Sequence, residues 1–226
     1  MIKTLDEKNL RGACEKLART DSDLAFIYET YGTPPLWARE ASFATLVHII
    51  LEQQVSLASA LSAFNKLKEK IGTVTPENVL NLSDEEMKAA YFSRQKTIYA
   101  RELAKAITSG NLVLESLRNL PDEKVKNELK KIKGIGDWTS DIYLLMALLR
   151  TDVMPKGDLA LHVAYQRLKN LEHRPNAEEF LIIAEKWKPL RAVAARLLWH
   201  FYLSERKIPT RKLNKNKKSA KFNSAD

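Results

Sequence analysis

Two glycines flank one aliphatic residue in Gly134-Ile135-Gly136, between two segments whose apolar spacing predicts helices. Glycine lets the backbone turn tightly and lets another group approach it closely. Such a turn exposes amide N–H groups at the start of the helix that begins near Trp138, and these groups suit an anion such as a phosphate. The same spacing is also typical of a helix C-cap with a tight turn between packed helices, so both interpretations stay open.

Asp158 follows Pro155-Lys156-Gly157 and precedes a pattern that predicts a helix over residues 159–168. A carboxylate fixed in a dry cleft stabilises a positive charge that develops during a reaction, or it orients a water molecule. An aspartate in front of a helix also serves as its N-cap. The two roles are compatible.

The other residues that could bind a metal or form a crosslink give no recognisable site. Cys14 is the only cysteine, which excludes an intramolecular disulfide, a four-thiolate zinc site and a cysteine-ligated iron–sulfur cluster. The histidines show no metal-ligand spacing; they are His48, His162, His173 and His200. We therefore expect no cofactor.

The elements that must position these groups are predicted to be helices throughout. Only 7 of 226 residues are glycine, which disfavours hairpin turns and an all-β fold. Thr75-Pro76 and the capping box from Ser83 to Glu86 predict two short helices. Residues 138–149 are apolar on nearly all sides, so this helix is expected at the centre of the fold, with Tyr143 and Trp187 in the core.

Charge and hydropathy limit the class of protein. The formal net charge is +9, which favours a polyanionic partner, but residues 206–226 alone contribute +7 of it. No run of about 18 apolar residues occurs, and residues 1–7 lack the apolar core of a secretion signal. We therefore expect no membrane contact and a cytoplasmic location, with the nucleoid or the nucleus as the place of action.

Several motifs occur in a fixed order along the chain. They are Leu51-Glu52-Gln53-Gln54-Val55-Ser56, Phe92-Ser93-Arg94-Gln95-Lys96, Ile132-Lys133-Gly134-Ile135-Gly136 with Trp138-Thr139, Pro155-Lys156-Gly157-Asp158, and Trp187-Lys188-Pro189-Leu190-Arg191 through Trp199. From about residue 43 to residue 202, the chain resembles the helix-hairpin-helix (HhH-GPD) DNA glycosylases. Within that superfamily it is most similar to the alkylbase branch, the DNA-3-methyladenine glycosylase II type.

The resemblance implies an all-α fold of two helical lobes with a DNA-binding cleft between them and the hairpin at the cleft. Residues 42–150 would form the central lobe. Residues 1–41 and 151–210 would form the second lobe, and residues 211–226 a basic disordered tail. We expect no N-terminal β-domain of the kind that some relatives carry.

The resemblance also implies a reaction. Asp158 would be the catalytic carboxylate that hydrolyses the N-glycosidic bond of alkylated purines, such as 3-methyladenine and 7-methylguanine, in duplex DNA. Trp138 stands where relatives with a lyase step have a lysine, and an indole cannot form an imine. We therefore expect a monofunctional glycosylase that leaves an abasic site.

Further residues receive roles from the same resemblance. Trp138 and Trp199 would form a pocket that selects a cationic base by cation–π contact. Gln54 would fill the gap left by the flipped nucleotide, and the sequence does not decide between it and the adjacent Gln53 for this role. The DNA backbone would be bound by Lys133, Gly134, Ile135, Gly136, Arg94 and Lys96. The backbone carbonyls of Ile132 and Gly134 would hold a monovalent cation.

The expected partner is double-stranded DNA that contains alkylated bases, bound by a monomer. Two alternatives remain open from the sequence. The same scaffold would act on another lesion, such as uracil, hypoxanthine or an oxidised base, or the chain would be a catalytically silent helix-hairpin-helix DNA-binding module. For individual residues, the tryptophans are also typical of core aromatics, and the lysines of solvated surface charges.

Overall fold

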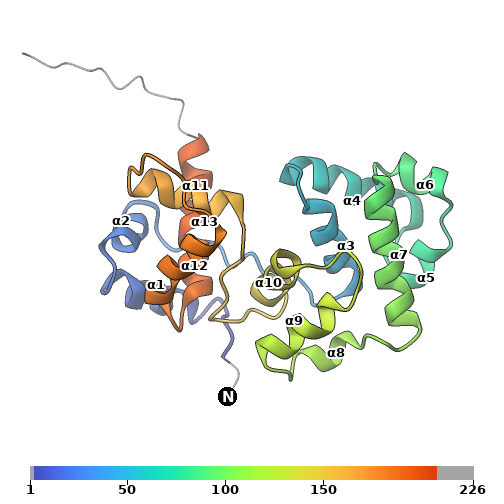
Figure 1. Ribbon diagram of the computed structural model, residues 1–226, viewed down its shortest axis with the longest axis horizontal. Helices are drawn as coiled ribbons and strands as arrows, with labels where there is room; N and C mark the ends of the chain where they lie inside the picture. The colour runs from blue at the N-terminus through green and yellow to red at the C-terminus, as the bar shows by residue number, and fades with distance from the viewer. Residues whose placement is uncertain (1–2, 208–226) are drawn as a thin grey trace, which may run out of the picture.

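The chain folds into an all-α structure, in agreement with the helix-start signals in its sequence. Figure 1 shows this structure, a computed structural model. The structure describes residues 3–207, so the predicted tail at 211–226 lies outside the described residues. Within residues 3–207 the backbone forms helices and no strand, apart from one isolated bridge between Thr4 and Arg150. The predicted all-α fold is confirmed.

The α-helices of residues 3–207 are α1 (Leu10–Ala18), α2 (Ser22–Tyr31), α3 (Phe43–Glu52), α4 (Leu57–Ile71), α5 (Pro76–Leu80), α6 (Asp84–Ala89), α7 (Arg94–Thr108), α8 (Leu114–Leu117), α9 (Asp122–Lys130), α10 (Asp137–Met146), α11 (Leu159–Leu168), α12 (Ala177–Ala184) and α13 (Arg191–Lys207). A 3-10 helix at Glu185–Trp187 follows α12. No helix among these is long and apolar enough to cross a membrane.

The helices lie in two groups, with α10 between them (Figure 1). Helices α3 to α9 form one group, in which α7 packs against α3, α5 and α6. Helices α1, α2, α11, α12 and α13 form the other, in which α13 packs against α1, α2 and α11. Helix α10 packs against α3 and α9 and is buried from Thr139 to Leu145. The predicted lobe boundaries at residues 42 and 150 stay predictions.

One buried arginine joins α13 to the segments between the two groups. Arg196 is fully buried and donates hydrogen bonds to the carbonyls of Leu36 (3.0 Å), Leu145 (2.7 Å) and Ala192 (3.0 Å). Burial lowers the pKa of this guanidinium to about 10. Because buried donors need acceptors, Arg196 fixes the linker before α3 and the end of α10 relative to α13.

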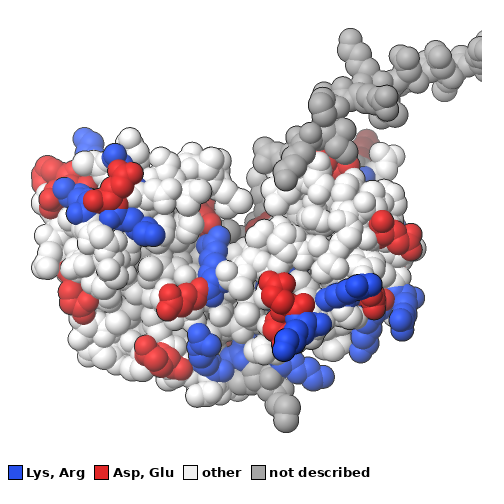
Figure 2. Space-filling model, turned by 180° about the vertical axis from the view of Figure 1, so that it is seen from behind, with Lys and Arg blue, Asp and Glu red and all other residues white. Residues whose placement is uncertain are grey.

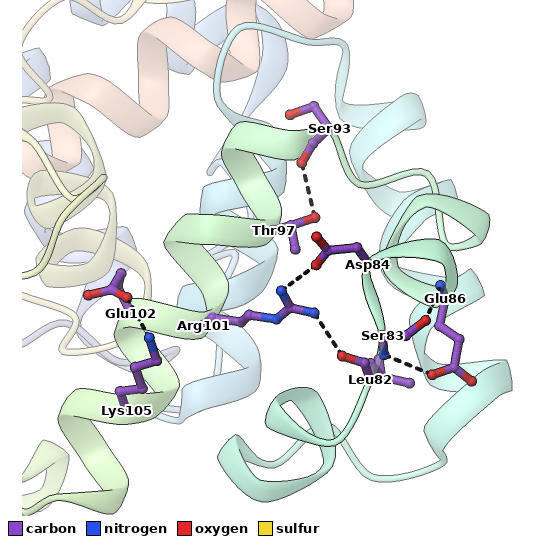
Figure 3. Close-up of polar contacts among 9 residues, drawn as sticks. All are labelled: Leu82, Ser83, Asp84, Glu86, Ser93, Thr97, Arg101, Glu102 and Lys105. Atoms are coloured by element: carbon purple, nitrogen blue, oxygen red, sulfur yellow. Dashed lines mark hydrogen bonds and ion pairs between the residues drawn. The ribbon is translucent and has the colours of Figure 1, made fainter.

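A network of polar contacts joins the start of α6 to α7 (Figure 3). Ser83 and Glu86 cap α6 reciprocally, as the sequence predicted. Arg101 of α7 forms an ion pair with Asp84 and donates to the Leu82 carbonyl (2.7 Å). Helices α6 and α7 are thereby fixed to each other on both sides of the turn.

Candidate active site

Asp158 caps α11, as its position before a predicted helix suggested. Its backbone is in the extended N-cap conformation, and side-chain Oδ1 accepts a hydrogen bond from the Leu161 N–H (3.0 Å). The residue is only 8% exposed. This cap accounts for one of the acceptor sites of the carboxylate and leaves the others for different partners.

Two indole rings donate to the same carboxylate. Trp138 Nε1, from the first turn of α10, lies 3.0 Å from Asp158 Oδ2. Trp199 Nε1, from the middle of α13, lies 3.1 Å from Oδ1. The structure therefore brings together all three residues of the predicted catalytic and base-pocket set. With a donor on each oxygen, the carboxylate plane has a defined orientation.

Asp158 has no cationic partner. Among the side chains that the structure describes, no Lys, Arg or His nitrogen lies within 4.0 Å of its oxygens. A comparison within the chain is Asp21, which also caps a helix and also accepts from an indole, Trp187 Nε1 (2.8 Å). Asp21, however, is ion-paired with Lys186 (2.8 Å). Within the described residues, Asp158 thus has no ion pair of the kind that Asp21 forms.

The loop that carries Asp158 is anchored at both ends. Asp141, 2% exposed on α10, accepts from the Lys156 N–H (3.1 Å) and pairs with Lys126 (3.0 Å). Burial raises the pKa of Asp141. Asp152 accepts from Arg191 Nε (2.8 Å) and Nη2 (3.1 Å). Sequence analysis missed Asp141, although a single acid within the apolar stretch 138–149 was a usable signal.

A third tryptophan, which the sequence analysis missed, lies beside Trp199. The rings of Trp37 and Trp199 are T-shaped, with centroids 6.2 Å apart. Trp37 is partly exposed and has a φ of +49°, in the left-handed region that is rare for a residue of its size. The linker that holds it is fixed by Arg39, whose N–H donates to the Met146 carbonyl (2.8 Å) and whose guanidinium donates to Glu52 (2.7 and 3.1 Å).

The glycine turn joins α9 to α10. Gly134 has a φ of +95°, and a Cβ atom there would lie 2.1 Å from Cγ of Tyr99. Only glycine therefore fits beneath this ring. Gly136 is the N-cap of α10 and provides no side-chain cap, and nothing lies within 4 Å of the position that its Cβ would take. The start of α10 thus lacks a side-chain cap, and the space next to Gly136 is open.

A groove of about 370 Å³ runs along this turn. Its lining includes five of the predicted DNA-contacting residues, together with Gln53, Gln95 and Tyr99; the five are Gln54, Lys96, Gly134, Ile135 and Gly136. The other two predicted contacts, Lys133 and Arg94, are exposed but do not line the groove. Tyr99 and Gln95 were missed, because their position depends on how α7 packs against the hairpin.

Gln53 and Gln54 differ in what they do. Gln53 Nε2 donates to the Gly134 carbonyl and to Thr139 Oγ1, both at 2.9 Å, and so fixes the hairpin to the end of α3. Gln54 is exposed and has a φ of +58°. Of the two side chains, Gln54 is the one that extends from the turn between α3 and α4.

Three groups that were predicted to bind DNA or a cation already have protein partners. Lys96 Nζ donates to the Leu51 carbonyl (2.6 Å) at the end of α3, and burial lowers the pKa of this amine. The carbonyls of Ile132 and Gly134 accept from Ile135 N–H (3.1 Å) and from Gln53. Each carbonyl has a second lone pair, so cation binding there stays a prediction. No cluster of three or more His, Cys, Asp or Glu suited to a metal occurs among residues 3–207.

Comparisons with known proteins agree with this geometry. A family model described as "HhH-GPD superfamily base excision DNA repair protein" matches residues 47–189. The putative DNA-3-methyladenine glycosylase YfjP of Bacillus subtilis is 27% identical over 201 residues, which are 85% of this chain and 69% of that protein. DNA-3-methyladenine glycosylase 1 of Schizosaccharomyces pombe is 32% identical over 165 residues, 71% of this chain and 72% of that protein.

Solved structures give the same result. A 3-methyladenine DNA glycosylase of Schizosaccharomyces pombe in complex with abasic DNA superposes with a TM-score of 0.78 at 29% identity, over 83% of this chain and 95% of that chain. A DNA-3-methyladenine glycosidase of Bacillus halodurans gives 0.72 at 26% identity, over 91% and 94%. The resemblance seen in the motifs is confirmed. Since the family model covers more than half of the chain, the protein belongs to the HhH-GPD superfamily of base excision DNA repair proteins.

Proposed function

We propose that this protein is a monofunctional DNA glycosylase that removes alkylated purines, 3-methyladenine and 7-methylguanine, from duplex DNA and leaves an abasic site. The observation that carries the proposal is Asp158, a nearly buried carboxylate on the loop that follows the hairpin helix α10. It accepts from two indole donors and forms no ion pair with any of the described residues. The names of the relatives support the same substrate class. Because one chain carries all of these groups, we propose that it acts as a monomer.

The proposed reaction depends on the negative charge of Asp158 and the positive charge that develops on the sugar. Cleavage of an N-glycosidic bond builds positive charge on the sugar, which a fixed carboxylate stabilises best where water is excluded. Asp158 meets this requirement, because its orientation is set by N–H donors and it has no ion pair within residues 3–207. An alkylated purine is already cationic and leaves readily, so the site needs no strong general acid. Asp158 then stabilises the sugar cation, or it orients the attacking water.

The tryptophans beside Asp158 suit a cationic base. We assign Trp138 and Trp199 to the base pocket and add Trp37, which packs against Trp199. Cation–π contact with an indole face is worth about 0.5 to 2 kcal/mol, and this favours a methylated purine over a neutral one. The indole N–H groups of Trp138 and Trp199 donate to Asp158, and their ring faces would contact the base. The same two rings would therefore position the carboxylate and select the cationic base.

Trp138 also argues against a lyase step. It occupies the second position after Gly136, where a Schiff-base lysine would be required, and an indole nitrogen cannot form an imine. The product would therefore be an intact strand with an abasic site.

We propose that the hairpin groove binds the DNA backbone and that Gln54 occupies the space of the flipped nucleotide. The uncapped amides at the start of α10 suit a phosphate oxygen. On the face seen in Figure 2, Lys and Arg side chains are interspersed with Asp and Glu, without one continuous basic stripe.

A lesion panel tests the proposal. Duplexes that each contain one 3-methyladenine, 7-methylguanine, hypoxanthine, ethenoadenine or uracil are incubated with the protein and then divided between neutral buffer and hot alkali. We expect release of the two alkylated purines, with strand breaks only after alkali. Breaks at neutral pH would contradict the monofunctional assignment, and release of uracil or hypoxanthine alone would contradict the substrate class. DNA binding without release of any base would instead support a binding module.

A further inference from the structure

A tight turn places Asp158 at the start of α11. The Asp158 N–H donates to the Pro155 carbonyl (3.4 Å), and Gly157 has a φ of +76°, in the left-handed region that favours glycine. Within the described chain, nothing lies within 4 Å of the position that a Gly157 Cβ would take. The Lys156 side chain forms an ion pair with Glu178 (2.7 Å), but both side chains are exposed, so this pair holds the turn only weakly.

The backbone of the turn is held by Asp141, in the middle of α10. The Lys156 N–H donates to Asp141 Oδ2 (3.1 Å), and Asp141 is 2% exposed. Asp141 follows Trp138 by three residues, so the two side chains lie on the same side of α10. Trp138 Nε1 donates to Asp158 Oδ2 (3.0 Å). Helix α10 therefore holds the turn at two points, the Lys156 backbone and the Asp158 carboxylate.

Asp141 is a costly residue for the fold alone. Its other oxygen, Oδ1, pairs with Lys126 of α9 (3.0 Å), yet burial still raises the pKa of this carboxyl. A buried ion pair is often no more stabilising than apolar side chains of similar size. Helices α9 and α10 also share a second, exposed ion pair, between Lys130 and Asp137, one helical turn nearer the hairpin. The bond to the Lys156 N–H is the contact that an apolar residue could not replace.

We propose that Asp141 is a positioning residue of the glycosylase reaction, because it fixes the turn that holds the Asp158 carboxylate in place for the sugar of the flipped nucleotide. This inference rests on the proposed function and names a further residue on which the rate depends. Lys126 supports Asp141 through the ion pair, and Asp141 supports the turn. A shift of about 1 Å in a catalytic group costs up to about a hundredfold in rate. Loss of the Asp141 acceptor should therefore slow base release more than it weakens DNA binding.

Two double variants separate the hydrogen bond from the ion pair. Asp141→Asn with Lys126→Met has neutral side chains and keeps an oxygen that can accept from the Lys156 N–H. Asp141→Leu with Lys126→Met is also neutral but has no acceptor. Single-turnover release of 7-methylguanine, affinity for a duplex with a tetrahydrofuran abasic analogue and the free energy of unfolding are measured for each.

The acceptor should decide the rate in these two proteins. We expect the double variant with Asp141→Asn to release the base within about threefold of the wild-type rate, and the one with Asp141→Leu to lose about tenfold to a hundredfold. Both should bind the abasic duplex within about threefold of the wild type, because the hairpin groove is unchanged.

The donor can be removed as well as the acceptor. Lys156 occupies the second position of the turn, where proline is favoured, so Lys156→Pro should keep the turn and delete the N–H. Lys156→Met keeps the N–H and removes only the ion pair with Glu178. We expect Lys156→Pro to lose as much rate as the double variant with Asp141→Leu, and Lys156→Met to release the base at the wild-type rate. This pair tests the positioning role even where the Asp141→Leu protein fails to fold.

A purely structural role gives a different pattern. If Asp141 only stabilises the fold, each folded variant keeps the wild-type rate while its free energy of unfolding falls, and this result would overturn the inference. Equal losses of rate in the two double variants, or in Lys156→Pro and Lys156→Met, would also overturn it. If the wild type releases no alkylated base, the proposed function fails and the inference fails with it. Release by the wild type together with an unaltered rate in Lys156→Pro refutes the positioning role alone.

Discussion

The hydrogen bond from Trp138 to Asp158 gives a prediction that can be worked out from the structure. The substitution Trp138→Phe keeps an aromatic ring but removes the N–H that lies 3.0 Å from Oδ2. Trp199 and Leu161 both donate to Oδ1, so Oδ2 would lose the one protein donor that the described structure gives it. The carboxylate would then be free to rotate away from the sugar or to take up water.

A hydrogen bond to a charged group is worth about 1.5 to 3 kcal/mol, and about 1.4 kcal/mol corresponds to a factor of ten in rate. We therefore expect kcat for 7-methylguanine release to fall between about tenfold and a hundredfold. Single-turnover rates and affinity for an abasic duplex should be measured together. The rate should fall much more than the affinity, because the bond positions Asp158 and does not hold the DNA backbone.

Trp187→Phe is the matched control. It removes an indole N–H from another helix-capping carboxylate, Asp21 Oδ2, at 2.8 Å, outside the candidate site. This variant should lower the free energy of unfolding by about 1 to 3 kcal/mol and leave the rate of base release unchanged. Full activity in Trp138→Phe, or an equal loss of rate in Trp187→Phe, would refute the reasoning.

Two further predictions concern binding and stability. Gly134→Ala should reduce DNA affinity and lower the thermal unfolding temperature, because its Cβ would lie 2.1 Å from Tyr99 Cγ at a φ of +95°. Wild-type affinity in this variant would show that the hairpin does not contact the DNA backbone. Burial lowers the pKa values of His48 and His162 below the ordinary value of 6.5, so the unfolded chain takes up protons at a higher pH than the folded chain. The free energy of unfolding should therefore fall as the pH drops below 6.5, by at most about 1.4 kcal/mol per pH unit for each histidine. His162→Gln should make the fall shallower in denaturant titrations at pH 7.5 and 5.5, and an unchanged slope would contradict this.

Features that depend on neighbours in sequence were predictable. The cap at Thr75, the capping box at Ser83 and the cap at Asp158 all occur where the residue types indicate, because each uses donors within three residues. Tyr143 and Trp187 lie in the core as expected, at 0% and 2% exposure. Helix ends were less predictable.

The helix predicted over residues 138–149 ends at Met146. Leu149 has a φ of +54°, so it lies outside the helix, and its carbonyl accepts from the Leu5 N–H (2.7 Å) of the N-terminal segment. No local signal encodes a partner that lies more than a hundred residues away.

The candidate site depends on distant contacts of the same kind. Trp138 and Trp199 meet at Asp158 only because α10, α11 and α13 pack around it, and the motifs alone did not show that their N–H groups face the carboxylate. Trp37 was missed because its left-handed backbone carries no sequence signal. Lys96 was expected to contact DNA, but its amine donates a hydrogen bond to the Leu51 carbonyl. The position of Lys96 in the sequence does not reveal this bond.

The central claim is that the unpaired charge of Asp158 drives cleavage of the glycosidic bond. The most direct measurement compares single-turnover release of 7-methylguanine by Asp158→Asn and by Asp21→Asn, each with its affinity for an abasic duplex. Both substitutions keep the shape of a helix-capping residue that accepts from an indole. We predict that Asp158→Asn loses at least about a hundredfold in rate while it still binds the duplex, and that Asp21→Asn retains its rate. An Asp158→Asn protein that releases the base at the wild-type rate would contradict the account.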